Sequence, residues 1–117
     1  MTTSMRGAFI FIGNVMHNCF NIDSTGQLRG VFVSVDQYAH GGIAVRLKDV
    51  VDGEQFATVS IHVHGVRLAA DEFIFKIYSE NEGLLESMLN AGFVETTGRS
   101  VQLSFGEPQP ICRLIKR

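Results

Sequence analysis

Tryptophan is absent from this chain, and cysteine and proline occur only twice each among its 117 residues. So few cysteines exclude a disulfide-rich scaffold. Cys19 and Cys112 each lie in an apolar segment, and nothing in the sequence favours a disulfide between them. We therefore expect both to be buried free thiols, as is usual in a reducing compartment.

Long hydrophobic runs are missing as well, since no apolar stretch approaches the roughly 18 to 20 residues of a membrane-spanning helix. The N-terminal run Ala8–Ile12 has one arginine before it and no small-residue cleavage site after it, unlike a signal peptide. We therefore expect a cytoplasmic protein that does not bind membranes. Hydrophobic residues make up 45% of the chain, which predicts one folded domain over residues 1–117.

A strong excess of positive charge is the third absence. The net charge is −2, and the basic residues are scattered except for a short cluster at the end, Arg113, Lys116 and Arg117. Proteins that bind DNA or RNA directly usually present a basic face. Direct nucleic-acid binding is therefore not expected.

What the chain does contain is a series of short β-strand patterns separated by turn residues. Runs of strand length cover the ranges 7–12, 15–22, 28–35, 43–48, 56–63, 73–77, 99–105 and 111–115. About seven strands without β–α–β alternation predict an α+β fold. We expect a mostly antiparallel, curved sheet or a small open barrel, with one helix packed on it.

The clearest predicted hairpin joins the ranges 43–48 and 56–63 through the turn signal Asp52-Gly53. Strict alternation along its second arm predicts one buried and one solvated face. The buried face would carry Ala57, Val59, Ile61 and Val63, and the solvated face Thr58, Ser60, His62 and His64.

The predicted helix covers residues 80–91. Ser79 and Glu82 have the spacing of a capping box, and Gly92 is placed for a left-handed C-cap. Glu80 and Glu82 could alternatively form a catalytic carboxylate pair, but residues two apart on a helix point about 200° away from each other. The helix start is therefore interpreted as structural, and its apolar stripe consists of Leu84, Leu85, Met88 and Leu89.

Metal binding is the remaining chemical hypothesis. His62 and His64 share one face of a predicted strand, and His17 or His40 could supply a third ligand. A catalytic zinc site needs three protein ligands and an open position. Because spacing alone is weak support, we predict no resident metal, no cofactor and no catalytic residue, and we keep His62, His64 and His17 as the alternative metal set.

Several short motifs resemble a family of small uncharacterised proteins carried by bacterial plasmids, phages and integrative elements. The resemblance runs from Ile43 to Leu114, and its most specific parts are Tyr78–Gly83 (YSENEG), Thr97–Arg99 (TGR) and Cys112–Leu114 (CRL). It implies no enzymatic activity and no catalytic residues. It implies instead an accessory role, in which such proteins often bind a host protein and inhibit a defence system such as CRISPR–Cas or restriction.

The first functional hypothesis is therefore a non-enzymatic protein that binds a host or element-encoded protein. The expected contact residues lie at the helix start and in the acidic hairpin turn: Tyr78, Glu80, Asn81, Asp49, Asp52 and Glu54. The second hypothesis is a small-ligand-binding protein or a metal-dependent enzyme that uses the histidines. A third is a homodimer formed by the strand 111–115 at a sheet edge.

Overall fold

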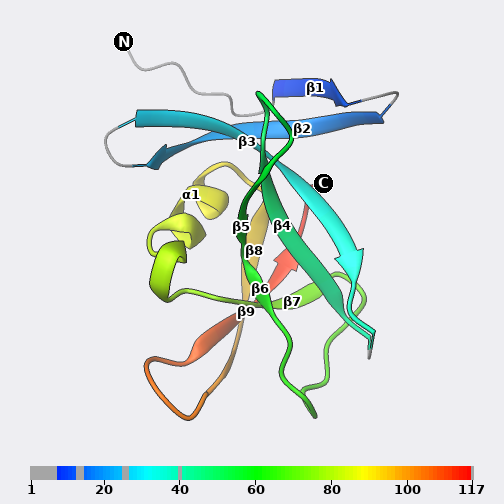
Figure 1. Cartoon of the computed structure of the whole chain (residues 1–117). Coiled ribbons are helices and arrows are strands. Elements are labelled where there is room, and N and C mark those ends of the chain that lie inside the picture. Colours follow the sequence, from blue (N-terminus) through cyan, green and yellow to red (C-terminus); the bar gives the residue numbers. More distant parts are fainter. Residues whose placement is uncertain (1–7, 13–14, 25–26, 40, 117) are drawn as a thin grey trace.

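The computed structural model describes residues 8–12, 15–24, 27–39 and 41–116, so the predicted turn at residues 13–14 lies outside the described part. Figure 1 shows the elements in order along the chain. They are β1 (Ala8–Ile12), β2 (Val15–Ser24), β3 (Gln27–Gln37), β4 (Ile43–Asp49), β5 (Gln55–Thr58), β6 (Ser60–Ile61), β7 (Glu72–Phe75), the 3₁₀ turn η1 (Ser79–Asn81), α1 (Leu84–Asn90), β8 (Val94–Val101) and β9 (Gln109–Leu114).

The strands form two antiparallel sheets. The first has the order β1-β2-β3-β4-β5 and the second the order β6-β7-β9-β8. The α+β class predicted from the sequence is confirmed, but the single curved sheet or open barrel is wrong.

The chain crosses from one sheet to the other at Val59, which lies between β5 and β6 and is fully buried. Its N–H donates to the Val45 carbonyl (2.9 Å), and its own carbonyl accepts from Lys76 N–H (2.7 Å). The predicted strand 56–63 is thus broken in two, because its halves pair with different neighbours. The alternation of apolar and polar residues did not reveal this break, because a strand that passes from one sheet to another keeps much of that alternation.

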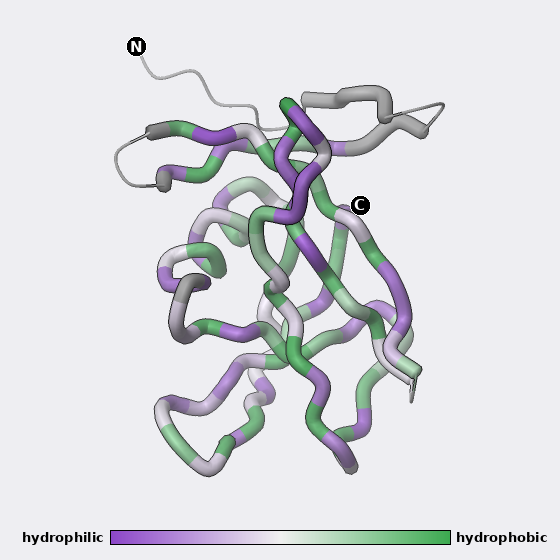
Figure 2. Tube along the Cα trace, viewed as in Figure 1, coloured by the Kyte–Doolittle hydropathy of each residue, from purple (hydrophilic) through white to green (hydrophobic). Residues whose placement is uncertain are grey.

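Buried side chains of both sheets and of α1 pack into one hydrophobic cluster. The ring centroids of Phe20 on β2 and Phe93 after α1 lie 4.5 Å apart. Hydrophobic residues recur among hydrophilic ones along the strands that enclose this core (Figure 2). Burial of such apolar surface is the main force that holds the two layers together.

The helix is shorter than predicted. Residues 79–81 form the 3₁₀ turn η1, and α1 begins only at Leu84, with Gly83 at its N-cap at φ 85°. No side chain caps either element, so the capping box of Ser79 and Glu82 is wrong. Glycine adopts this left-handed conformation at low cost, which explains why it stands inside the predicted first turn.

The C-terminal end of α1 confirms the sequence prediction. Gly92 has φ 77°, and its N–H donates to the Leu89 carbonyl (3.1 Å). The N–H of Phe93 donates to the Met88 carbonyl (2.9 Å). These two bonds form a Schellman motif, which satisfies carbonyls that the helix end leaves open.

The last two strands differ from the prediction. The strand expected at 99–105 is β8, which ends at Val101, and Phe105 is 56% exposed in the loop that follows. The strand expected at a sheet edge is β9, which lies between β7 and β8. It therefore has no free edge for the predicted dimer contact.

Cys19 and Cys112 are buried free thiols, as predicted. Burial raises the pKa of both thiols, that of Cys112 to about 11, because the thiolate is poorly solvated there. Among the described residues, no helix has the length and apolar character needed to cross a lipid bilayer.

Candidate functional site

Two surface pockets bring polar and aromatic side chains together. The first, here called the acidic pocket, has a volume of about 390 Å³ and lies between the segment that leads into η1 and the loop after β8. Its lining is Ile77, Tyr78, Ser79, Glu82, Phe105, Gly106, Glu107 and Gln109.

An aromatic pair forms one wall of the acidic pocket. The rings of Tyr78 and Phe105 meet edge to face with centroids 5.4 Å apart. The Lys76 ammonium lies 5.2 Å from the centroid of the Tyr78 ring. Tyr78 is therefore held in place by two neighbours, whereas Phe105 keeps more than half of its surface exposed.

A buried glutamine joins the two walls of this pocket. Gln109, 1% exposed, accepts a hydrogen bond from Ile77 N–H at Oε1 (2.8 Å). Its Nε2 donates to the carbonyl of Glu107 (2.7 Å). The segment before η1 and the loop after β8 are thus tied together through a single side chain.

The backbone is strained at Ser79, which lines the pocket. Its φ of 62° is the one positive value at a non-glycine residue among those described. This left-handed conformation costs roughly 1–2 kcal/mol for a residue with a Cβ. Such outliers gather at functional sites, so this one marks the acidic pocket as a candidate site.

The charged residues of the described lining are both acidic. Glu82 and Glu107 are exposed there, while the Lys76 ammonium, which is not itself part of the lining, lies over the Tyr78 ring. An aromatic wall beside two carboxylates suits a partner group that combines a positive charge with an apolar surface.

Of the contact residues predicted at the helix start, Tyr78 lines this pocket. Asn81 is 1% exposed, so its prediction as a contact residue is wrong. Its Nδ2 donates to the carbonyls of Thr58 (2.7 Å) and Lys76 (3.0 Å), and thereby fastens η1 to the ends of β5 and β7. Glu80 lies within η1, and its side chain is outside the described part of the structure.

The acidic turn predicted as a second contact surface lies at the opposite end of the molecule from the loop after β8 (Figure 1). Asp49 and Asp52 have structural partners there. Asp49 accepts from Val51 N–H (2.8 Å) and pairs with Arg29 (3.3 Å), and Asp52 accepts from Glu54 N–H (2.9 Å). The structure therefore separates the two predicted patches, so they cannot form one continuous surface.

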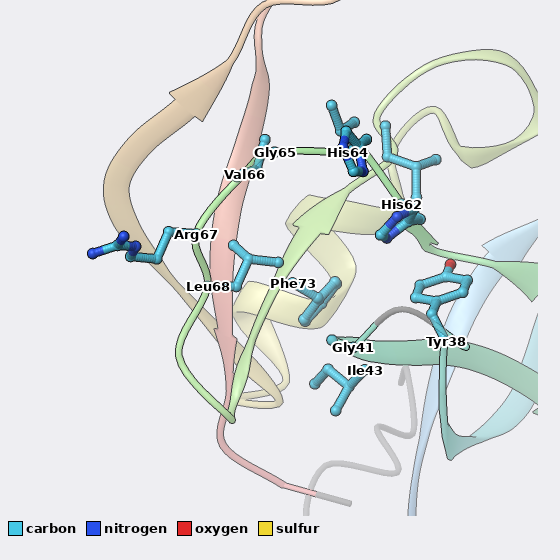
Figure 3. A pocket seen from close by; sticks show the side chains of 13 residues that line it. Tyr38, Gly41, Ile43, His62, His64, Gly65, Val66, Arg67, Leu68 and Phe73 are labelled. Atoms are coloured by element: carbon cyan, nitrogen blue, oxygen red, sulfur yellow. The ribbon is translucent and has the colours of Figure 1, made fainter.

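The second pocket, here called the histidine pocket, has a volume of about 560 Å³ and lies between the β3–β4 turn and the segment after β6. Figure 3 shows His62 between His64 and the ring of Tyr38. The Tyr38 and His62 ring centroids are 5.5 Å apart. The lining is Tyr38, Gly41, Gly42, Ile43, Ile61, His62, Val63, His64, Gly65, Val66, Arg67, Leu68 and Phe73.

Tyr38 is positioned by a hydrogen-bonded chain that the sequence did not reveal. Its hydroxyl bonds to Ser60 Oγ (2.9 Å), which also accepts from Val45 N–H (2.9 Å). Ser60 is 2% exposed, so its predicted place on the solvated face is wrong. The alternation misplaced Ser60 because the two consecutive residues Val59 and Ser60 are both buried at the crossover.

Of the alternative metal set, the structure describes the side chains of His62 and His64 alone. In the part of the chain that the structure describes, no three His, Cys, Asp or Glu side chains lie together as metal ligands. His62 and His64 share one pocket but lie beyond the end of β6, and the side chain of His17 on β2 falls outside the description.

A buried carboxylate fixes the wall of the histidine pocket. Glu72 at the start of β7 accepts from Ala69 N–H (2.8 Å) and from Arg99, and Arg113 lies 3.8 Å away. The bond from Ala69 and the bond and charge of Arg99 lower the pKa of Glu72 below its ordinary value, although burial opposes this shift. Arg99 also donates to the Arg67 carbonyl (3.3 Å), so the cluster holds the segment that lines the pocket.

The sequence reasoning missed Phe105, Glu107 and Gln109 as site residues. It placed Phe105 at the end of the predicted strand 99–105, although Gly106 and Pro108 follow closely and are typical of a loop. The glycine and proline were the available signal. Gln109 gave none, because only the fold shows which backbone groups it bonds.

Comparison of this chain with protein families, with curated proteins and with solved structures finds no match.

Proposed function

We propose that this chain is a non-enzymatic accessory protein of a mobile genetic element and binds a partner protein through the acidic pocket. The observation that carries the proposal is the half-exposed Phe105, which lies against Tyr78 beside two carboxylates. Aromatic residues with one apolar face and a defined position are frequent energetic centres of protein interfaces.

The rigidity of the pocket supports binding. Gln109 ties its two walls together, and Lys76 and Phe105 hold the ring of Tyr78. A site that is already ordered loses less side-chain entropy when a partner binds. The strained backbone of Ser79 fits the same interpretation, because strain persists where a local shape is selected.

The partner that fits this chemistry presents an arginine or lysine next to an apolar side chain. Glu82 and Glu107 would attract the positive charge, and the aromatic wall would receive the apolar part. The resemblance to proteins of mobile elements adds the biological context. We accordingly propose that the partner is a basic surface of a host defence component, such as a nucleic-acid-binding face in a CRISPR–Cas or restriction system.

The test compares the wild-type chain with the variant Tyr78→Ala/Phe105→Ala in a host that carries a CRISPR–Cas or a restriction system. We expect the wild-type chain to retain a defence protein on purification and to raise plasmid entry, and the variant to lose both effects. Leu28→Ala is the matched control, since Leu28 is a similarly exposed apolar residue (55%) outside this pocket.

Retention should also weaken as salt rises, because exposed carboxylates attract a basic partner mainly through screened charge. Equal retention by the wild-type chain and the double variant would overturn the assignment to the acidic pocket. Unchanged plasmid entry in every tested host would overturn the role in defence inhibition.

A further inference from the structure

The histidine pocket has the opposite character to the acidic one. Its described lining contains two imidazoles and Arg67 but no aspartate or glutamate. Figure 3 shows the Arg67 side chain directed away from the imidazoles, so the two imidazoles are the polar side chains beside Tyr38 in the pocket. Their N–H groups can donate to an anion, and no carboxylate of the described lining opposes it, so a negatively charged ligand is favoured over a positively charged one.

The floor of the pocket is apolar. Ile43 and Phe73 are buried side chains of the core, and Leu68 is half-buried beside them. The pocket volume of about 560 Å³ lies within the usual range for small-molecule sites. A single metal ion would leave most of this volume and the apolar floor without a role.

The polar side of the pocket is ordered in advance. The chain of hydrogen bonds from Val45 N–H through Ser60 Oγ to the Tyr38 hydroxyl fixes the Tyr38 ring against His62. Imidazole N–H groups can donate hydrogen bonds to a carboxylate. A flat ligand ring can then pack on Tyr38 in the offset or edge-to-face manner of aromatic pairs.

From this arrangement, we infer that the histidine pocket is a binding site for a small planar aromatic carboxylate. His62 and His64 hold the carboxylate, Tyr38 packs on the ring, and Ile43, Leu68 and Phe73 receive its apolar body. This inference is independent of the proposed partner binding, which concerns the other pocket.

The test uses a pair of probes that share one ring system and differ in charge, 1-naphthoate and 1-naphthylmethylammonium. Each is titrated into the ¹⁵N-labelled full chain, and the amide shifts are followed by NMR. We expect naphthoate to shift amides of residues 38–43 and 61–68, with an affinity about tenfold or more above that of the ammonium probe.

The variant His62→Ala/His64→Ala should lower the naphthoate affinity by about tenfold. Both side chains are exposed, so the variant should keep the amide spectrum of a folded chain. The variant Tyr78→Ala/Phe105→Ala serves as the matched control and should bind naphthoate like the wild type.

Equal binding of both probes, shifts spread over the whole surface, or an unchanged affinity of the histidine variant would overturn the inference. None of these results would affect the proposed function of the acidic pocket. Conversely, loss of partner retention in the variant Tyr78→Ala/Phe105→Ala would not bear on the inference about the histidine pocket.

Discussion

The two pockets differ in charge and in the way the fold builds them. Carboxylates and an exposed aromatic pair form the acidic pocket, whereas imidazoles and an apolar floor form the histidine pocket. A loop held by Gln109 shapes the first, and the meeting of the two sheets near Ser60 shapes the second. A small fold can therefore present two pockets of different chemistry whose described linings share no residue.

The largest expected effect comes from removing the side chain that supports η1 below the acidic pocket. Asn81→Ala leaves the part-buried carbonyls of Thr58 and Lys76 without their side-chain donor. We expect a loss of about 2–3 kcal/mol in the free energy of unfolding, measured by urea denaturation.

Asn90→Ala, at an exposed position of α1, is the matched control and should change stability by no more than about 0.5 kcal/mol. Amide shifts in the Asn81 variant should concentrate around η1 and the loop after β8. Comparable shifts at residues 61–68 would show that the two pockets are not separate.

The corresponding change below the histidine pocket is Ser60→Ala. It removes the acceptor of Val45 N–H and the partner of the Tyr38 hydroxyl. We expect a loss of about 1–2 kcal/mol in stability and weaker naphthoate binding, since Tyr38 is no longer held.

Ser87→Ala, on the exposed side of α1, should leave both quantities nearly unchanged. If Ser60→Ala kept the wild-type affinity for naphthoate, Tyr38 would not need its hydrogen-bonded chain for binding.

Acid should loosen the wall of the histidine pocket. The pKa of Glu72 is lowered in the folded chain, so its contribution to stability is present above the unfolded value of about 4.3 and is lost as the pH falls through the folded value. We expect the free energy of unfolding to fall with pH from about 5 downwards.

Glu72→Gln should flatten this acid dependence, whereas Glu86→Gln on the exposed face of α1 should preserve it. The check is urea denaturation at a series of pH values. An identical slope for the wild type and the Glu72 variant would contradict the role assigned to the cluster.

The smallest effect on stability is expected from reversing the charge of the acidic pocket. Glu82→Lys/Glu107→Lys changes exposed side chains only and should alter the free energy of unfolding by no more than about 0.5 kcal/mol. The variant should nevertheless gain naphthoate-dependent shifts at residues 77–79 and 105–109. If these shifts did not appear, charge alone would not decide which of the two pockets binds the naphthoate anion.

The fold class and most strands could be predicted because apolar periodicity reflects local burial. The C-terminal end of α1 could also be predicted, because the left-handed backbone conformation that ends the helix is one that Gly92 itself favours. The crossover at Val59 could not be predicted, because it depends on which distant residues form hydrogen bonds with the N–H and the carbonyl of Val59. Ser60 was misplaced for the same reason.

Three of the polar residues in the motifs that carry the resemblance have structural partners inside the fold. Arg99 of the TGR motif and Arg113 of the CRL motif both lie at the buried carboxylate of Glu72. Asn81 of the YSENEG motif is an internal support. Polar residues of a motif can therefore serve the fold itself, whereas Tyr78 of the same YSENEG motif lines the acidic pocket beside Phe105.

The crossover at Val59 also links the alignment of the two sheets. Its N–H is committed to β4 and its carbonyl to the residue after β7. A slip by one residue in the pairing of β4 with β5 would therefore misalign β6 with β7 as well, and would turn the side chains of both to the wrong face. One peptide segment thus couples the register of β5 in the first sheet to the register of β6 in the second.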